Sequence, residues 1–167
     1  IARCVCSVLE NDLPGLRIVV VSHNTPKADV EAALGKIARD ERVSLYELTD
    51  GLNGPSSPKD FGLSVSEADY VSFVDSDDTL DPGTLDRWVR IAQEDHADFV
   101  IANREEPGGE NAASPPVRIG RRRDLNGAKD RLAYRAAPLG LMRRSTFGDL
   151  RFPQGIPTGE DIPFSAA

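Results

Sequence analysis

A run of β-branched residues near the start constrains the fold of this chain most. Residues 17–22 read Arg-Ile-Val-Val-Val-Ser, without the alternation of apolar and polar side chains that marks a strand with one face in water. A continuous run of this kind is typical of a strand buried on both faces, and such strands occur in sheets that helices cover on both sides. A helical pattern follows, with four apolar residues on one face: Val30, Ala33, Leu34 and Ile37.

Strands and helices continue to alternate along the chain. Further strands are predicted at residues 43–48, 70–74, 99–102 and 139–142. Helices are predicted at residues 1–9, at 26–37, at 59–68 after a turn-rich loop at 51–58, and at 82–92. Thr25-Pro26 and Asp81-Pro82 are each expected to form the N-cap and the first residue of a helix. This order predicts an α/β fold, an αβα sandwich with a mostly parallel central sheet.

The length and the ends of the chain bear on its domain organisation. A chain of 167 residues predicts one domain, over residues 1–167. Ile1 lies inside a helical pattern and residues 162–167 stop without a cap. We therefore expect the domain to be incomplete at both ends.

Composition limits what the domain can bind. It carries 27 acidic against 20 basic side chains, a net charge of -7, which argues against a nucleic-acid-binding role. No apolar run approaches the roughly 20 residues that span a bilayer. Cys4 and Cys6 are too few for a disulfide framework, so a cytoplasmic location is expected. Two positions apart on a helix, they face different sides, and we do not expect them to share a metal ion.

An acidic cluster, Asp75-Ser76-Asp77-Asp78, follows the strand predicted at 70–74. Ligands of open α/β sheets bind beyond the carboxyl ends of strands. Because side chains at i and i+2 of a strand share a face, Asp75 and Asp77 are expected to converge and to need a cation between them. Oxygen ligands suit Mg²⁺ or Mn²⁺, and Asp78 is a third candidate ligand. The alternative is a solvated turn with Asp81 as a helix cap.

Residues 69–81, Asp-Tyr-Val-Ser-Phe-Val-Asp-Ser-Asp-Asp-Thr-Leu-Asp, closely resemble the central motif of family 2 glycosyltransferases, which have the GT-A fold. Gly54-Pro55 through Lys59-Asp60-Phe61-Gly62 is similar to the Gly-rich stretch of that family, with Lys59 and Asp60 where Arg and Asn are usual. The resemblance implies that Pro55 and Lys59 lie at the donor site. The Gly-Pro form of this loop is most similar to the bacterial branch that glycosylates wall teichoic acid and related polymers.

A third motif lies near the end of the chain. Residues 141–145, Phe152 and Gly159-Glu160-Asp161 resemble the second block of the family, in which a Glu-Asp pair holds the catalytic base. The resemblance implies that Asp161 is the general base, with Glu160 as the second candidate. Taken alone, the pair could instead be acidic residues at a helix N-terminus.

Together these motifs imply an inverting glycosyltransferase. It would move a sugar from a nucleotide-sugar, most often a UDP-sugar, to a hydroxyl of a cell-envelope glycan or polyol-phosphate acceptor. A Mn²⁺ or Mg²⁺ ion at Asp75 and Asp77 would neutralise the diphosphate leaving group. An anionic or lipid-linked acceptor would allow peripheral association with the inner face of the cell membrane. The domain could also form a homo-oligomer.

Two departures favour a second hypothesis. The family opens with a strand that ends in a Pro-x-Tyr-Asn-like turn, which this chain does not supply, so the resemblance implies that the first strand and the C-terminal part of the domain are not present. The family also has an Asp-rich turn where this chain reads Ser22-His23-Asn24-Thr25. A degenerate, non-catalytic GT-A domain, acting as a scaffold or acceptor-binding module, would tolerate such changes. A nucleotidyltransferase would need a Gly-rich, basic loop after the first strand, which the sequence does not show.

Three further features have ordinary structural explanations. His23 is expected at a strand end as a turn residue, and Trp88 falls on the apolar stripe of its helix. Seven basic residues lie in the Pro- and Gly-rich part of the chain: Arg118, Arg121, Arg122, Arg123, Lys129, Arg131 and Arg135. They could contact a diphosphate or an anionic acceptor, or could simply be solvated.

Overall fold

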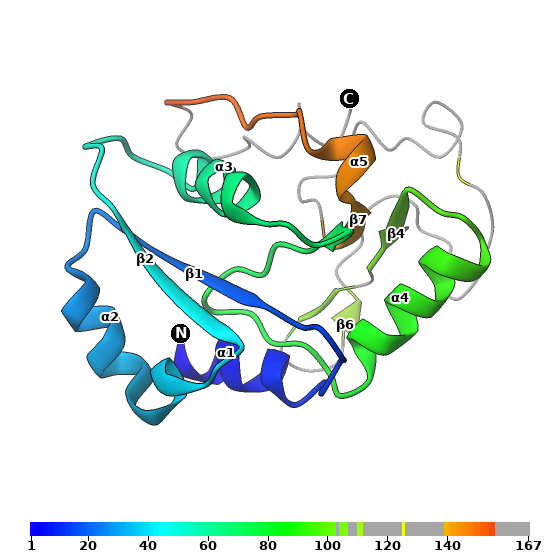
Figure 1. Cartoon of the computed structure of the whole chain (residues 1–167), viewed down its shortest axis with the longest axis horizontal. Helices are drawn as coiled ribbons and strands as arrows, with labels where there is room; N and C mark the ends of the chain where they lie inside the picture. Colours follow the sequence, from blue (N-terminus) through cyan, green and yellow to red (C-terminus); the bar gives the residue numbers. More distant parts are fainter. Residues whose placement is uncertain (103, 107–109, 112–124, 126–138, 156–167) are drawn as a thin grey trace.

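Helices and strands alternate over residues 2–101, as the sequence predicts (Figure 1). The computed structural model describes residues 1–102, 104–106, 110–111, 125 and 139–155. In chain order the elements are α1 (Ala2–Leu9), β1 (Ile18–His23), α2 (Lys27–Leu34), the 3-10 helix η1 (Gly35–Arg39), β2 (Val43–Leu48), α3 (Ser56–Val65), β3 (Tyr70–Val71), α4 (Thr84–Glu94), β4 (Phe99–Ile101), β5 (Glu105–Glu106), β6 (Glu110–Asn111), β7 (Gly140–Arg143) and α5 (Arg144–Phe147).

The strands form a parallel pair, a three-stranded antiparallel sheet and a small hairpin. β1 and β2 are parallel, with Ile18 opposite Val43. β7 lies between β3 and β4 and is antiparallel to both, with Tyr70 opposite Arg143. β5 and β6 form the hairpin. The α/β class is therefore confirmed, whereas the mostly parallel arrangement is found only in part, because the strand that returns to the sheet at β7 runs in the opposite direction.

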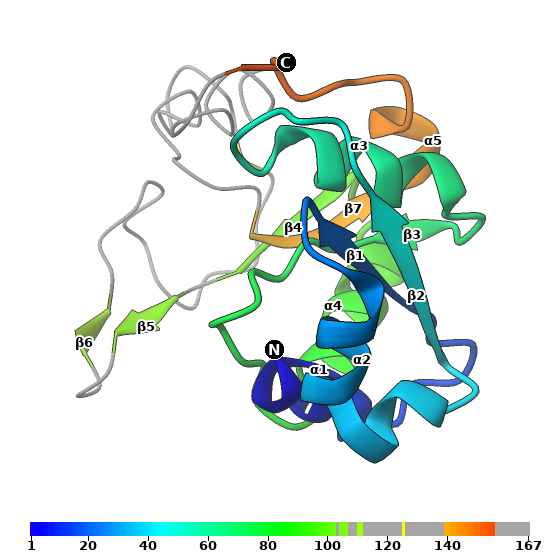
Figure 2. The ribbon, with the colours of Figure 1, turned by 90° about the vertical axis from the view of Figure 1, so that its left-hand side faces the viewer.

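Helices lie on both sides of the parallel pair, with α1 and α2 on one side and α3 on the other (Figures 1 and 2). One core cluster joins α1, β1 and α2 through the buried residues Val5, Val20 and Leu34. A second joins α4, β4 and β7 through Ala92, Val100 and Leu141, and Trp88 packs against it as expected. A third is built on Met142 and Phe152, each 1% exposed.

The close approach of β7 to β4 explains one glycine. Gly140 has φ 132, in the region that favours glycine, and a Cβ atom at this position would collide with the carbonyl oxygen of Val100. Larger residues are excluded at this contact. The spacing between these two strands therefore depends on the glycine.

The predicted start of α2 is wrong. The helix begins at Lys27 with Pro26 at the N-cap position, and the Thr25 hydroxyl donates to the backbone carbonyl of His23 instead of capping the helix. Gly35, with φ 59, ends α2 directly after Leu34, so Ile37 lies on η1. Ala33 is exposed and was wrongly assigned to the core face.

Three other boundaries also differ from prediction. α4 has Gly83 at its N-cap, because Asp81 and Pro82 instead form a turn in which the Thr84 N–H donates to the Asp81 carbonyl at 3.2 Å. α3 starts at Ser56, three positions before the predicted Lys59. Pro58 lies in the first turn of α3, where its missing N–H is not needed. β3 ends at Val71, well before the predicted residue 74.

Candidate functional site

The acidic cluster forms a turn that follows β3. Asp75 and Asp77 are exposed and Asp78 is half-buried. The Asp78 N–H donates to the Asp75 carbonyl at 3.0 Å, a bond that closes a turn. The prediction that Asp75 and Asp77 share a strand face is therefore wrong, because β3 ends at Val71 and both residues lie in the turn after it. Both carboxylates nevertheless reach solvent on the same short loop.

The acidic turn has the donor chemistry of a divalent metal site but not a complete ligand set. Within the described part of the chain, no group of three or more His, Cys, Asp or Glu side chains could hold a metal ion. Mg²⁺ and Mn²⁺ are commonly held by one or two carboxylates together with water and substrate phosphates. The exposed oxygens of Asp75 and Asp77 fit that mode of binding, in which a phosphorylated ligand completes the coordination.

Helix α1 contacts the backbone of the acidic turn. Arg3 Nη2 donates to the Asp77 carbonyl at 2.8 Å, and Cys4 Sγ donates to the Asp75 carbonyl at 3.4 Å. Burial raises the pKa of the Cys4 thiol, which keeps it protonated and able to donate. Cys4 is buried and Cys6 exposed, which confirms that they face different sides of α1.

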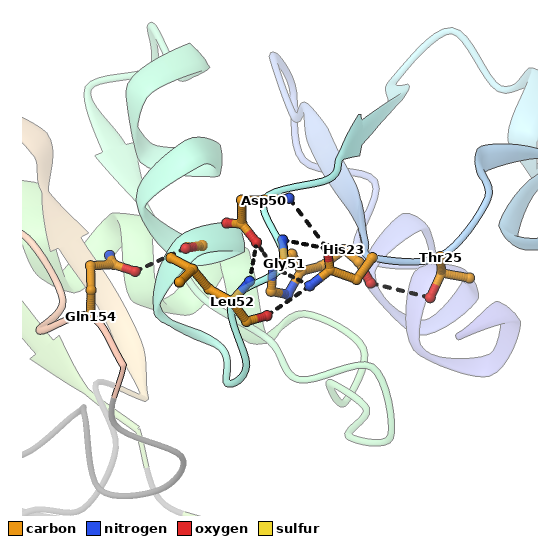
Figure 3. Close-up of polar contacts among 8 residues, drawn as sticks. His23, Thr25, Asp50, Gly51, Leu52 and Gln154 are labelled. Carbon is orange, nitrogen blue, oxygen red and sulfur yellow. Dashed lines mark hydrogen bonds and ion pairs between the residues drawn. The ribbon is translucent and has the colours of Figure 1, made fainter.

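A second polar group lies at the carboxyl ends of β1 and β2 (Figure 3). His23 Nε2 lies 2.8 Å from Asp50 Oδ1. Asn24 Oδ1 accepts from the N–H of Gly51 at 3.2 Å, and Asn24 Nδ2 donates to the Leu52 carbonyl at 2.7 Å. The hydrogen bonds from His23 and from the Leu52 N–H lower the pKa of Asp50 to about 2. In parallel sheets this edge is where ligands bind.

Sequence reasoning missed Asp50. His23 is the last residue of β1, as expected for a strand end, and pairs with Leu48 in the parallel register. Asp50 follows Leu48 by two positions, so the register of the strands brings the histidine and the acid together. The signal available in the sequence was a single acid after the second strand, which becomes informative only once the pairing of the strands is known.

The Gly-rich stretch packs against residues 152–154. Ser56 Oγ donates to the Pro153 carbonyl at 2.8 Å, and Asp60 Oδ2 accepts from Gln154 Nε2 at 2.8 Å. Burial raises the pKa of Asp60. Lys59 Nζ lies 5.3 Å from the centre of the Phe152 ring. The loop and α3 thus hold the last described segment of the chain.

The residues implied at the donor site occupy defined positions on this stretch. Pro55 is the N-cap residue of α3, and its carbonyl accepts from the Lys59 N–H at 3.1 Å. Lys59 lies in the next turn of the helix, over Phe152. Glu160, Asp161 and the basic residues from Arg118 to Arg135 lie outside the described residues.

A polar cavity of about 440 Å³ lies at the other end of β3, lined in part by Asp69, Tyr70 and Arg143. Arg143 and Arg144 both line it, and both are engaged within the protein: Arg144 Nε donates to the Ala68 carbonyl at 3.0 Å. Arg143 Nε donates to Asp98 Oδ1 at 3.1 Å, and the guanidinium lies 5.1 Å from the centre of the Tyr70 ring. The acidic turn and the His23–Asp50 group are therefore the stronger candidates.

Two curated relatives that align with nearly the whole chain are bacterial glycosyltransferases. The chain is 22% identical, over 171 residues, to poly(ribitol-phosphate) beta-glucosyltransferase of Bacillus spizizenii, covering 99% of this chain and 26% of that protein. It is 25% identical, over 166 residues, to the poly(ribitol-phosphate) beta-N-acetylglucosaminyltransferase TarS of Staphylococcus aureus, covering 95% of this chain and 28% of TarS. The chain thus spans about a quarter of the length of these relatives.

The fold is similar to that of solved TarS structures. A fragment of S. aureus TarS, residues 1–349, in complex with UDP-GlcNAc superimposes with a TM-score of 0.80 at 21% identity, covering 97% of this chain and 47% of the other. The same fragment in complex with UDP gives a TM-score of 0.81 at 22% identity, with 99% and 49% covered. The predicted GT-A-like architecture is therefore confirmed.

The family model for glycosyl transferase family 2 matches residues 1–151, which include the acidic turn, the His23–Asp50 group and all of α3. The match covers most of the chain and contains the central motif from which the resemblance was first inferred. On this evidence, and with the fold shared with TarS, the chain belongs to glycosyl transferase family 2.

Proposed function

We propose that this chain is the donor-binding domain of an inverting glycosyltransferase that uses a UDP-sugar and a divalent metal ion. The observation that carries the proposal is the exposed acidic turn after β3, in a family 2 domain whose fold matches TarS. The two TarS complexes with UDP-GlcNAc and UDP support a nucleotide-sugar donor.

The chain's own residues would share the work of the transfer. Asp75 and Asp77 would hold Mn²⁺ or Mg²⁺, with Asp78 as a further candidate ligand. When bound, the ion would neutralise charge on the departing diphosphate. Asp161 would take the proton of the attacking acceptor hydroxyl, and Glu160 is the second candidate for this role. Direct attack needs no covalent intermediate on the protein.

A hydroxyl-bearing envelope polymer is the proposed acceptor. The two named relatives act on poly(ribitol-phosphate), a polyol-phosphate polymer, which supports an acceptor of the same class. Such an acceptor, together with a nucleotide-sugar donor, would locate the domain in the cytoplasm or peripherally at the inner face of the membrane. Among the described helices, none has the length and apolar character to cross a bilayer.

The test is a calorimetric titration of UDP into the protein with and without Mn²⁺. We expect binding that depends on the metal and is lost in Asp77→Asn, because the amide removes the negative charge that holds the ion. Asp81→Asn is the matched control, since Asp81 is also exposed and lies in the same segment outside the acidic turn. Equal binding by wild type and Asp77→Asn, or no binding at all, would contradict the proposal.

A non-catalytic domain is the second candidate, and one observation favours it. At the carboxyl ends of β1 and β2, His23 bonds to Asp50, and Asn24 bonds to the loop backbone at Gly51 and Leu52. Polar groups that are already paired have less capacity to bind a nucleotide. This candidate predicts binding of a polyol-phosphate polymer without metal-dependent binding of UDP.

A further inference from the structure

We propose that helix α1 positions the acidic turn, and that Ser7 and Asn11 are its positioning residues. The inference rests on the proposed function, since it concerns how the backbone that carries Asp75 and Asp77 is held in place for a metal ion. Neither Ser7 nor Asn11 needs to touch the donor. Ser7 would act through the main chain of the loop between β3 and α4, and Asn11 through the main chain of the first turn of α4.

The loop has little regular structure of its own. β3 ends at Val71 and α4 begins at Thr84, so residues 72–83 belong to no helix or strand. Its main-chain bonds include the one from Asp78 to Asp75 and the one from Thr84 to Asp81, each of which spans a single turn. A loop stabilised only by local turns would sample many conformations. Contacts from outside the loop are needed to fix it.

Polar side chains at α1 supply these contacts. Ser7 Oγ accepts from the Leu80 N–H at 3.1 Å, and Asn11 Oδ1 accepts from the Leu85 N–H at 3.0 Å. Ser7 lies on α1, and Asn11 lies two residues after its end, following the C-cap residue Glu10. Their partners are 73 and 74 residues away in the sequence: Leu80 lies shortly after the acidic turn and Leu85 in the first turn of α4.

Further contacts reach the two acidic residues themselves. As described above, Arg3 and Cys4 donate to the backbone carbonyls of Asp77 and Asp75. These bonds fix the main chain at both positions and leave both carboxylates exposed. Helix α1 and the residue Asn11 after it therefore hold this segment at the two acids, at Leu80 and at the start of α4.

Ser7 and Asn11 are linked into one satisfied network. They are 9% and 8% exposed, so their polar atoms need partners inside the protein. The Ser7 hydroxyl donates to the Cys4 carbonyl at 2.7 Å, which leaves its lone pairs for Leu80. Asn11 Nδ2 donates to the Ser7 carbonyl at 2.9 Å, which turns Oδ1 toward Leu85. A fully satisfied buried network of this kind is rigid.

The test measures the Mn²⁺ affinity of the protein saturated with UDP, by titration calorimetry on the whole chain. Ser7→Ala leaves the Leu80 N–H of the loop without its partner, and Asn11→Leu does the same to the Leu85 N–H in the first turn of α4. We expect each change to lower the Mn²⁺ affinity about tenfold. Ser7→Thr keeps the hydroxyl and should restore the affinity to near the wild-type value. A general loss of stability would not produce this rescue.

Leu141→Ala is the control for stability. Leu141 is buried on β7 in the core cluster with Ala92 and Val100, away from α1, and its truncation destabilises the fold. The inference is overturned if Ser7→Ala and Asn11→Leu bind Mn²⁺ like the wild type, or if Leu141→Ala weakens binding as much as they do. If the wild type itself binds no Mn²⁺ with UDP, the proposed function fails and this inference fails with it.

Discussion

Asp50 illustrates how one residue couples the site to pH. Its pKa is about 2, below the ordinary value of 3.8, because it accepts hydrogen bonds from His23 and from the Leu52 N–H. A carboxyl whose pKa is lower in the folded state stabilises the fold above its unfolded pKa. That contribution is present above about pH 4 and is lost as the pH falls through about 2.

We therefore expect Asp50→Asn to be less stable than the wild type at pH 5, and expect the difference in melting temperature to shrink as the pH falls toward 2. Thermal unfolding followed by circular dichroism at a series of pH values measures this. Asp81→Asn, which changes an exposed carboxylate, should show no such convergence. A constant difference between Asp50→Asn and the wild type from pH 5 to pH 2 would rule the coupling out.

At the scale of elements, the contact between β7 and β4 depends on Gly140. An alanine there would have its Cβ against the Val100 carbonyl oxygen, in a backbone conformation with φ 132 that L-residues rarely adopt. We expect Gly140→Ala to lower the free energy of unfolding by about 2–4 kcal/mol. Urea denaturation measures the change. Gly62→Ala, in α3 with open space around the glycine, should be neutral or stabilising by up to about 1 kcal/mol.

The elements also show which features the sequence could predict. β1 and β2 were predicted to within one residue because continuous β-branched or mixed apolar runs mark buried strands. The starts of α2 and α4 were predicted wrongly because Thr25 and Asp81 are residue types that often cap helices. The Thr25 hydroxyl instead donates to the His23 carbonyl, and Asp81 begins a turn in which its carbonyl accepts from the Thr84 N–H. β3 was predicted too long because the apolar residues Phe73 and Val74 continue the strand pattern after the ladder has ended.

The candidate site was predictable only where its residues are neighbours in the sequence. Asp75, Asp77 and Asp78 could be singled out because they form one acidic run after an apolar strand. The partners of that run on α1, and the pairing of His23 with Asp50, depend on contacts between distant segments. Such contacts leave no local periodicity or spacing, so they become visible only in the folded molecule.

At the scale of the whole molecule, the two polar groups of the candidate site belong to different sheets. His23 and Asp50 lie at the end of the parallel pair, whereas Asp75 and Asp77 follow β3 of the antiparallel sheet. A nucleotide-sugar donor that uses both would join them through one molecule, with its diphosphate at the metal and its nucleoside at β1 and β2. Metal alone would engage only the acidic turn.

Hydrogen exchange read by mass spectrometry distinguishes these cases. We expect Mn²⁺ alone to slow exchange at residues 75–80, and UDP with Mn²⁺ to slow it at residues 49–54 as well, because ligand binding stabilises the segments that it holds. Asp77→Asn should abolish both effects. Protection confined to 75–80 in the presence of UDP and Mn²⁺ would mean that the paired His23, Asn24 and Asp50 do not receive the nucleoside. That result would favour the non-catalytic candidate, because a metal site without nucleoside recognition cannot select a UDP-sugar.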